Sequence, residues 1–128
     1  MTERDVEAIR VLLVEDEAGD AGLAQLALRG FRNARFRVVW VQTLADAALN
    51  IGTENYDIIL LDLTLPDSTG LATVERVRTV AGITPIIVLT GQSDTEFGLS
   101  TLKAGAADYL VKGDFGYDGL ARTIFYTL

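Results

Sequence analysis

Five short aliphatic segments recur along the chain, and their spacing is the feature that most limits its fold. They are residues 11–16, 36–41, 57–63, 85–90 and 108–112. Each is bounded by polar or glycine-containing stretches, which is typical of buried strands. The first, third and fourth are continuous apolar runs, and such runs are typical of parallel strands that are covered on both faces.

Helical patterns fill the gaps between these segments. The apolar positions with helical spacing are Leu23, Leu26, Ala27 and Gly30 in the first gap, Leu44, Ala47, Ala48 and Ile51 in the second, and Leu71, Val74, Val77 and Ala81 in the third. Ser93 and Glu96 form a capping-box pattern for a fourth helix that Gly105 would end. A last helix is expected from about Asp118. The alternation predicts an α/β fold, with a parallel sheet between two layers of helices.

Length and charge narrow the class of protein. The chain has 128 residues, the size of one domain, and contains no pattern for an output domain. Its net charge of −7 argues against direct binding to nucleic acid or to anionic lipid. No apolar run approaches the ~20 residues of a membrane helix, and the charged N-terminus does not resemble a signal peptide. We therefore expect a cytoplasmic location. The last residues, IFYTL, lack a helix-ending signal, so we expect the natural chain to continue.

Polar side chains follow four of the five predicted strands. Glu15 and Asp16 end the first, Asp62 lies near the end of the third, Thr90 ends the fourth and Lys112 ends the fifth. Taken singly, each is compatible with an ordinary polar turn. Because ligands of open parallel sheets bind beyond the carboxyl ends of the strands, the five residues together predict a functional site at one edge.

The chemistry of this predicted site follows from its donor atoms. Three carboxylates placed together repel one another and require a cation. The chain has neither histidine nor cysteine, so the oxygen ligands favour Mg²⁺, with Mn²⁺ as an alternative. Asp62 could then act as a nucleophile toward phosphorus, while Lys112 and the hydroxyl of Thr90 bind the transferred oxygens. Asp67 is assigned instead to the turn that starts the third helix.

At this point the sequence resembles the receiver domains of two-component response regulators. The motifs that carry the resemblance are LLVEDE, LLDLTLPDSTGL, PIIVLTG and KAGAADYLVK, and the match extends from about Val11 onward. It implies a flavodoxin-like (βα)5 sandwich with strand order 2-1-3-4-5 and a single receiver domain over 1–128, with its core from about residue 10.

The resemblance also assigns roles to residues. Asp62 would accept a phosphoryl group from the phosphohistidine of a histidine kinase or a phosphotransfer protein. Glu15 and Asp16 look like the acidic metal pair, with Asp16 as the direct ligand, and the backbone carbonyl of Thr64 would supply another metal oxygen.

The resemblance further implies a switch and an output face. Thr90 and Tyr109 look like the switch pair, although Tyr109 is also compatible with an ordinary strand aromatic. The fourth helix, fifth strand and fifth helix would form the face that carries the change to an effector, an appended output domain or a second copy of the chain. Gly113 replaces the proline that usually follows the lysine, which makes the position of Lys112 less constrained, and Phe115 is expected to anchor the same loop.

Three other functions stay open on the sequence alone. A degenerate receiver would keep the fold only as a docking module. A flavodoxin-like electron carrier shares the fold, but the acidic stretch after the first strand would repel the phosphate of a flavin nucleotide. A phosphatase of the haloacid dehalogenase type needs a second aspartate two positions after the nucleophile, where this chain has Thr64.

Overall fold

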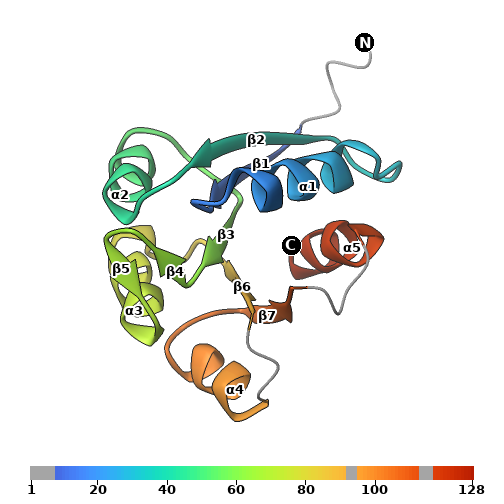
Figure 1. Ribbon diagram of the computed structural model, residues 1–128. Coiled ribbons are helices and arrows are strands. Elements are labelled where there is room, and N and C mark those ends of the chain that lie inside the picture. The colour runs from blue at the N-terminus through green and yellow to red at the C-terminus, as the bar shows by residue number, and fades with distance from the viewer. Residues whose placement is uncertain (1–7, 92–94, 113–116) are drawn as a thin grey trace.

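The computed structural model describes residues 8–91, 95–112 and 117–128 of the chain (Figure 1). Its elements, in order, are β1 (Ile9–Val14), α1 (Ala18–Arg29), β2 (Phe36–Val41), α2 (Leu44–Thr53), β3 (Ile58–Asp62), β4 (Thr64–Leu65), β5 (Ser68–Thr69), α3 (Leu71–Ala81), β6 (Ile86–Thr90), α4 (Thr95–Lys103), β7 (Asp108–Val111) and α5 (Tyr117–Thr127). Within these residues, no helix combines the length and the apolar character that crossing a membrane requires.

The main sheet has five parallel strands in the order β2-β1-β3-β6-β7. The two-residue strands β4 and β5 form a separate hairpin, so β6 and β7 are the fourth and fifth of the predicted strands. The predicted order 2-1-3-4-5 is therefore confirmed. Helices α1 and α5 cover one face of the sheet, and α2, α3 and α4 cover the other (Figure 1).

Strand β3 lies at the centre of the sheet and contributes to both hydrophobic cores. Ile58 and Leu60 pack in the core beneath α1 and α5, whereas Ile59 and Leu61 pack in the core beneath α2 and α3. Burial of each such side chain contributes about 1.5–3 kcal/mol. A register shift of one residue would exchange the two sets, so this strand holds its last residue, Asp62, at a fixed position on the edge of the sheet.

The buried face of α1 differs from the face that the sequence pattern predicts. Leu23 and Leu26, which we expected to face the core, are 43% and 61% exposed. The buried residues of this helix are Ala21, Ala24, Ala27 and Leu28. Helix α1 packs against both the sheet and α5, and small side chains allow this close approach. The predicted pattern therefore placed Ala27 correctly but misplaced Leu23 and Leu26, because it was weighted toward large aliphatic residues.

Asp67 lies in the hairpin turn between β4 and β5, but it caps a different helix from the one predicted. Its two carboxylate oxygens accept hydrogen bonds from the backbone N–H groups of Leu44 (2.8 Å) and Ala45 (3.0 Å) at the start of α2. Helix α3 instead begins after Gly70, which has a φ of 73° and makes no side-chain cap. Local turn chemistry gave the turn correctly, but the partner of Asp67 is more than twenty residues away in sequence.

Several predictions concern residues outside those described. The capping residue Ser93, the substitution at Gly113 and the anchoring role of Phe115 all belong to this group. The fourth helix ends at Lys103 as α4, and Gly105 follows with a φ of 121°, in agreement with its predicted role at the helix end.

Candidate functional site

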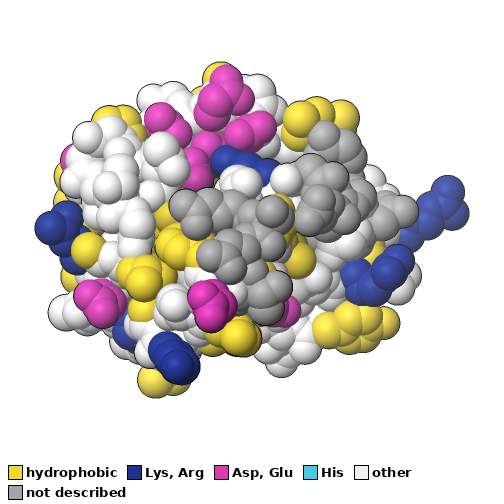
Figure 2. Space-filling view, turned by 60° about the horizontal axis from the view of Figure 1, so that its bottom comes forward, with side chains coloured by type: hydrophobic (Ala, Val, Ile, Leu, Met, Phe, Trp, Pro, Cys, Tyr) yellow, Lys and Arg dark blue, Asp and Glu magenta, His cyan; other side chains and the backbone are white. Residues whose placement is uncertain are grey.

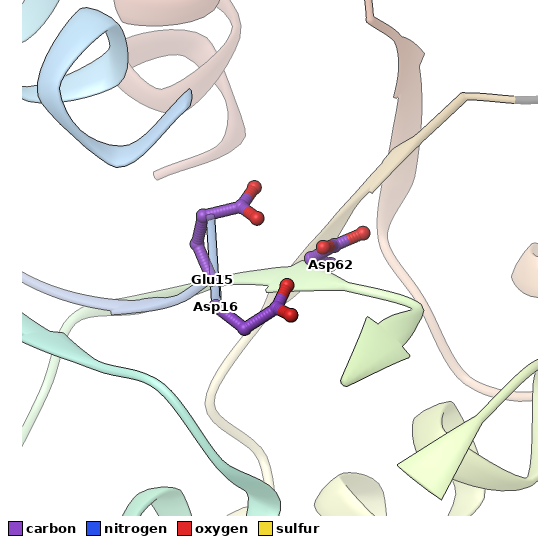
Figure 3. Close-up of side chains that lie close together, drawn as sticks. All are labelled: Glu15, Asp16 and Asp62. Atoms are coloured by element: carbon purple, nitrogen blue, oxygen red, sulfur yellow. The ribbon is translucent and has the colours of Figure 1, made fainter. Parts of the chain in front are cut away.

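Three carboxylates meet where β1 and β3 end side by side in the sheet. Glu15 and Asp16 directly follow β1, and Asp62 is the last residue of β3. One carboxylate oxygen from each lies within 4.8 Å of those of the other two (Figure 3). Glu15 and Asp62 are 1% and 5% exposed, whereas Asp16 faces solvent. The cluster therefore has a buried side and an open side.

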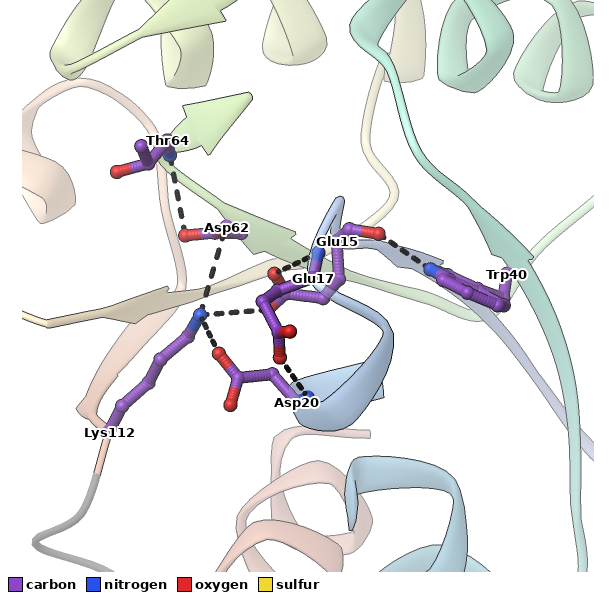
Figure 4. A network of polar contacts seen from close by, with 7 residues as sticks. All are labelled: Glu15, Glu17, Asp20, Trp40, Asp62, Thr64 and Lys112. Carbon is purple, nitrogen blue, oxygen red and sulfur yellow. Dashed lines mark hydrogen bonds and ion pairs between the residues drawn. The ribbon is translucent and has the colours of Figure 1, made fainter. Parts of the chain in front are cut away.

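Lys112 brings a positive charge to this cluster from the end of β7. Its Nζ donates to Oε1 of Glu15 at 2.8 Å and lies 3.6 Å from Oδ2 of Asp62 (Figure 4). It also donates to Oδ2 of Asp20 at 3.0 Å. Figure 2 shows acidic side chains gathered on one part of the surface with basic atoms beside them. The predicted convergence of Glu15, Asp16, Asp62 and Lys112 at one edge is thus present in the structure.

The buried position of Glu15 changes its protonation. Burial raises the pKa of Glu15 to about 7, an effect that the hydrogen bond from Lys112 opposes and the proximity of Asp62 increases. For Lys112, burial lowers the pKa, but the hydrogen bonds to Glu15 and Asp20 and the charge of Asp62 outweigh burial, so its pKa lies above the ordinary value. Lys112 is therefore a permanent cation in this site.

Asp62 is held less tightly than Glu15. Its Oδ1 accepts a hydrogen bond from the backbone N–H of Thr64 at 3.3 Å, and its Oδ2 has the 3.6 Å contact with Lys112. Both distances exceed the usual range for strong hydrogen bonds to a carboxylate. Thr64 itself is the first residue of β4 and is exposed beside Asp62. The carboxylate of Asp62 thus keeps lone pairs that can react or bind a cation.

Thr90 lies on β6, the strand next to β3, and Tyr109 lies on β7, the strand beyond it. Thr90 is the buried last residue of β6, and its carbonyl accepts the backbone N–H of Lys112 at 2.7 Å. Tyr109, on β7, is half-buried, and its ring lies against Gly98 of α4. A Cβ atom added to Gly98 would be closer than 3.0 Å to the Cζ, Cε1 and Cε2 atoms of this ring.

Two further side chains contact the site, and neither was predicted. Asp20 pairs with Lys112, and the indole N–H of Trp40 donates to the backbone carbonyl of Glu15 at 2.5 Å (Figure 4). Asp20 lies in the first turn of α1, where an acidic residue is usual at any helix start. Trp40 lies near the end of β2, which pairs with β1 in the sheet. This neighbouring position was the one sequence signal that could have placed Trp40 close to Glu15.

The residues of the carboxylate cluster fit a hard divalent cation. Mg²⁺ prefers oxygen ligands, uses one or two carboxylates and keeps several waters. Glu15, Asp16 and Asp62 supply closely spaced oxygens, and the exposure of Asp16 leaves the outer side of the cluster open to water and phosphate. The donor set is therefore suitable for Mg²⁺.

The chain resembles curated proteins in sequence and solved structures in fold. The chain is 38% identical over 104 residues to the swarming motility regulation protein RssB of Serratia marcescens, covering 81% of this chain and 46% of that protein. It is similar to the solved structure of a putative response regulator from Chloroflexus aurantiacus, with 28% identity and a TM-score of 0.83 over 94% of this chain and 98% of that chain. It is also similar to the BeF3-activated receiver domain of DrrB, with 26% identity and a TM-score of 0.79 over 94% of this chain and 97% of that chain. The chain spans less than half the length of the Serratia marcescens protein RssB. Residues 11–122 match the family model of the response regulator receiver domain, and the chain belongs to this family.

Proposed function

We propose that this receiver domain is a phosphoacceptor of a two-component system, and that Asp62 takes a phosphoryl group from a histidine kinase or a phosphotransfer protein in the cytoplasm. The observation that carries the proposal is the convergence of a buried aspartate, a lysine ammonium group and two further carboxylates at the end of β3. An aspartate that served only the fold would not need this surrounding set of charges.

The reaction is a transfer between two covalent carriers. A carboxylate oxygen of Asp62 attacks the phosphorus atom of the donor phosphohistidine, forming an acyl phosphate as the P–N bond breaks. The imidazole nitrogen keeps the bonding electron pair and takes a proton from solvent. Because the chain has no histidine, the donor must be another domain or a small acyl or amido phosphate.

The neighbouring residues would stabilise the charge on the transferred group. Lys112 would bind one phosphoryl oxygen through its ammonium group, and the hydroxyl of Thr90, at the end of the adjacent strand, would donate to another. Glu15, Asp16, Asp62 and the backbone carbonyl of Thr64 would hold Mg²⁺. When bound, Mg²⁺ would offset the negative charge on the phosphoryl oxygens as phosphorus passes from the imidazole nitrogen to the carboxylate oxygen of Asp62.

The output would pass through α4, β7 and α5. Thr90 and Tyr109 occupy adjacent strands, and Tyr109 touches α4 at Gly98, so a movement of Thr90 toward the phosphoryl group could be followed by the tyrosine ring and then by the helix. Helix α4 exposes Leu99 and Leu102. These side chains support this face as the docking surface for an effector, an output domain or a second copy of the chain.

Intact mass after incubation with acetyl phosphate and Mg²⁺ tests the phosphoacceptor role. We expect the mass of one phosphoryl group on the wild type, no addition to Asp62→Asn, and strongly reduced addition when Mg²⁺ is removed by a chelator. Asp67→Asn is a matched control, because Asp67 lies five residues away but is bonded to α2 rather than to the site. It should be phosphorylated like the wild type.

The contrary results are equally definite. No addition to a folded wild type, with acetyl phosphate or with a phosphorylated histidine donor, would favour the docking-module alternative. Equal addition to the wild type and to Asp62→Asn would place the phosphoryl group elsewhere.

A further inference from the structure

The ammonium group of Lys112 is displaced from the proposed acceptor toward α1. Its Nζ lies 3.0 Å from Oδ2 of Asp20 and 2.8 Å from Oε1 of Glu15, but 3.6 Å from Oδ2 of Asp62. Three carboxylates thus share one cation, and Asp62 has the longest of the three contacts (Figure 4). A group bound to Asp62 would have to draw Lys112 away from the other two.

The carboxylate of Asp20 is positioned by the start of α1. The backbone N–H of Asp20 donates to Oε1 of Glu17 at 2.8 Å, and Glu17 is the N-cap of the helix. The side chain of Asp20 is 44% exposed and takes no part in either hydrophobic core. Its charge can therefore be removed while the helix cap and the packing of α1 are retained.

We propose that Asp20 is a positioning residue that holds the ammonium group of Lys112 beside α1 and competes for it with a phosphoryl group on Asp62. The inference rests on the proposed function, because the competing phosphoryl group is the one that Asp62 would receive. Glu15 makes the same kind of contact, but it is buried within the carboxylate cluster, whereas the carboxylate of Asp20 lies outside the cluster and pairs with Lys112.

The competition has a direction. An acyl phosphate on Asp62 carries more negative charge than the free carboxylate, so it attracts Lys112 more strongly than Asp62 does alone. Asp20 opposes this movement for as long as it pairs with the ammonium group. Loss of its charge should therefore release Lys112 toward the phosphoryl group and strengthen the binding of a phosphoryl analogue.

The first test observes the ammonium group directly, without metal or phosphoryl group. The chain has two lysines, Lys103 and Lys112, so two side-chain ¹⁵N ammonium signals are expected in an NMR spectrum at low temperature. Lys112, held by hydrogen bonds, should give a signal with slowly exchanging protons, and the exposed Lys103 serves as the internal reference. Asp20→Ala should shift the Lys112 signal and speed its proton exchange. Glu17→Gln, which removes a charge from the same turn but keeps the side-chain oxygen that accepts from the backbone of Asp20, should not.

The second test measures the affinity for beryllofluoride, a phosphoryl analogue, in the presence of Mg²⁺. Asp20→Ala should bind it about two- to five-fold more tightly than the wild type, the range expected for a partly exposed ion pair. Asp20→Asn, which keeps a neutral acceptor for Lys112, should give a smaller gain. In a Lys112→Met background, the gain in beryllofluoride affinity caused by Asp20→Ala should fall to the gain caused by Glu17→Gln, because Asp20 would have no ammonium group to hold.

The outcomes separate the two claims. An unchanged Lys112 signal in Asp20→Ala would refute the positioning role, and so would an equal gain in affinity with and without Lys112, which would make Asp20 only a general repulsive charge. A wild type that binds no beryllofluoride and accepts no phosphoryl group would refute the proposed function. The ammonium signal would still show whether Asp20 holds Lys112.

Discussion

Replacement of Gly98 by alanine tests the contact between α4 and the ring of Tyr109. In an open helix interior, Gly→Ala stabilises by about 1 kcal/mol, because alanine loses less backbone freedom on folding. At Gly98 the added Cβ would overlap three atoms of the Tyr109 ring. Overpacking of this kind costs about 1–3 kcal/mol. The sum predicts that Gly98→Ala changes stability by between about zero and 2 kcal/mol in the destabilising direction.

A second glycine provides the matched control. Gly22 is also a helical glycine, in α1, and a Cβ at this position would have nothing within 4 Å. Gly22→Ala should therefore stabilise the protein by about 1 kcal/mol. The two substitutions make the same chemical change, so the difference of about 1–3 kcal/mol between them isolates the contact with Tyr109.

Urea unfolding of the metal-free proteins measures both free energies. The overlap also predicts that Tyr109→Ala removes the penalty, so in that background Gly98→Ala should become stabilising, as Gly22→Ala is. In the Gly98→Ala protein, the ring of Tyr109 should turn toward solvent, which a change in the near-ultraviolet circular dichroism would report. The reasoning is wrong if Gly98→Ala stabilises the otherwise unchanged protein as much as Gly22→Ala does.

Three further predictions concern the site and its surroundings. Burial raises the pKa of Glu15 to about 7 from an ordinary value of 4.5, so between these pH values the folded state holds a proton that the unfolded chain releases. The free energy of unfolding of the metal-free protein should therefore fall as the pH rises from 4.5 to about 7, by at most about 3 kcal/mol. Glu15→Gln should flatten this slope in urea unfolding, and an unchanged slope would contradict the assignment. Hydrogen bonds from Leu44 and Ala45 lower the pKa of Asp67, so Asp67→Ala should reduce stability near neutral pH, and the difference from the wild type should vanish in acid as the carboxylate is protonated. Trp40→Phe removes a hydrogen bond, of about 1 kcal/mol, to the backbone carbonyl of Glu15, which lies between β1 and Asp16. Its affinity for Mg²⁺, measured by calorimetry, should therefore be about five-fold lower than that of the wild type. Equal affinities would argue against this role of Trp40.

The sheet and its edge could be predicted because both depend on local patterns. Continuous aliphatic runs such as 58–61 identify strands that are buried on two faces, and strands that alternate with helices leave few topologies. Once the strands are parallel, the residues at their ends must lie at one edge. The sequence therefore predicted the convergence of Asp62 and Lys112 without any knowledge of their distance.

The remaining features depend on contacts between distant parts of the chain. Asp20 and Lys112 are 92 positions apart, and an acid in the first turn of a helix has an ordinary local explanation. The exposure of Leu23 and Leu26 follows from the close packing of α1 against the sheet and α5, which a helical period counted on large residues does not capture. In both cases, tertiary contacts selected one of several arrangements that the local sequence allows.

The link between Asp67 and α2 has a consequence for how the segment behind Asp62 opens. Strands β4 and β5 have two residues each, too few to be stable as an isolated hairpin. Besides the end of β3, the hairpin is held by hydrogen bonds from α2 to Asp67 and by hydrogen bonds between Ser68 and the α3 residues Thr73 and Arg76. Local unfolding of α2 or of α3 would remove one of these two attachments, so amide hydrogens in residues 64–70 should exchange with solvent faster than those of β3. The segment beside the proposed acceptor is therefore coupled to two neighbouring helices as well as to the central strand.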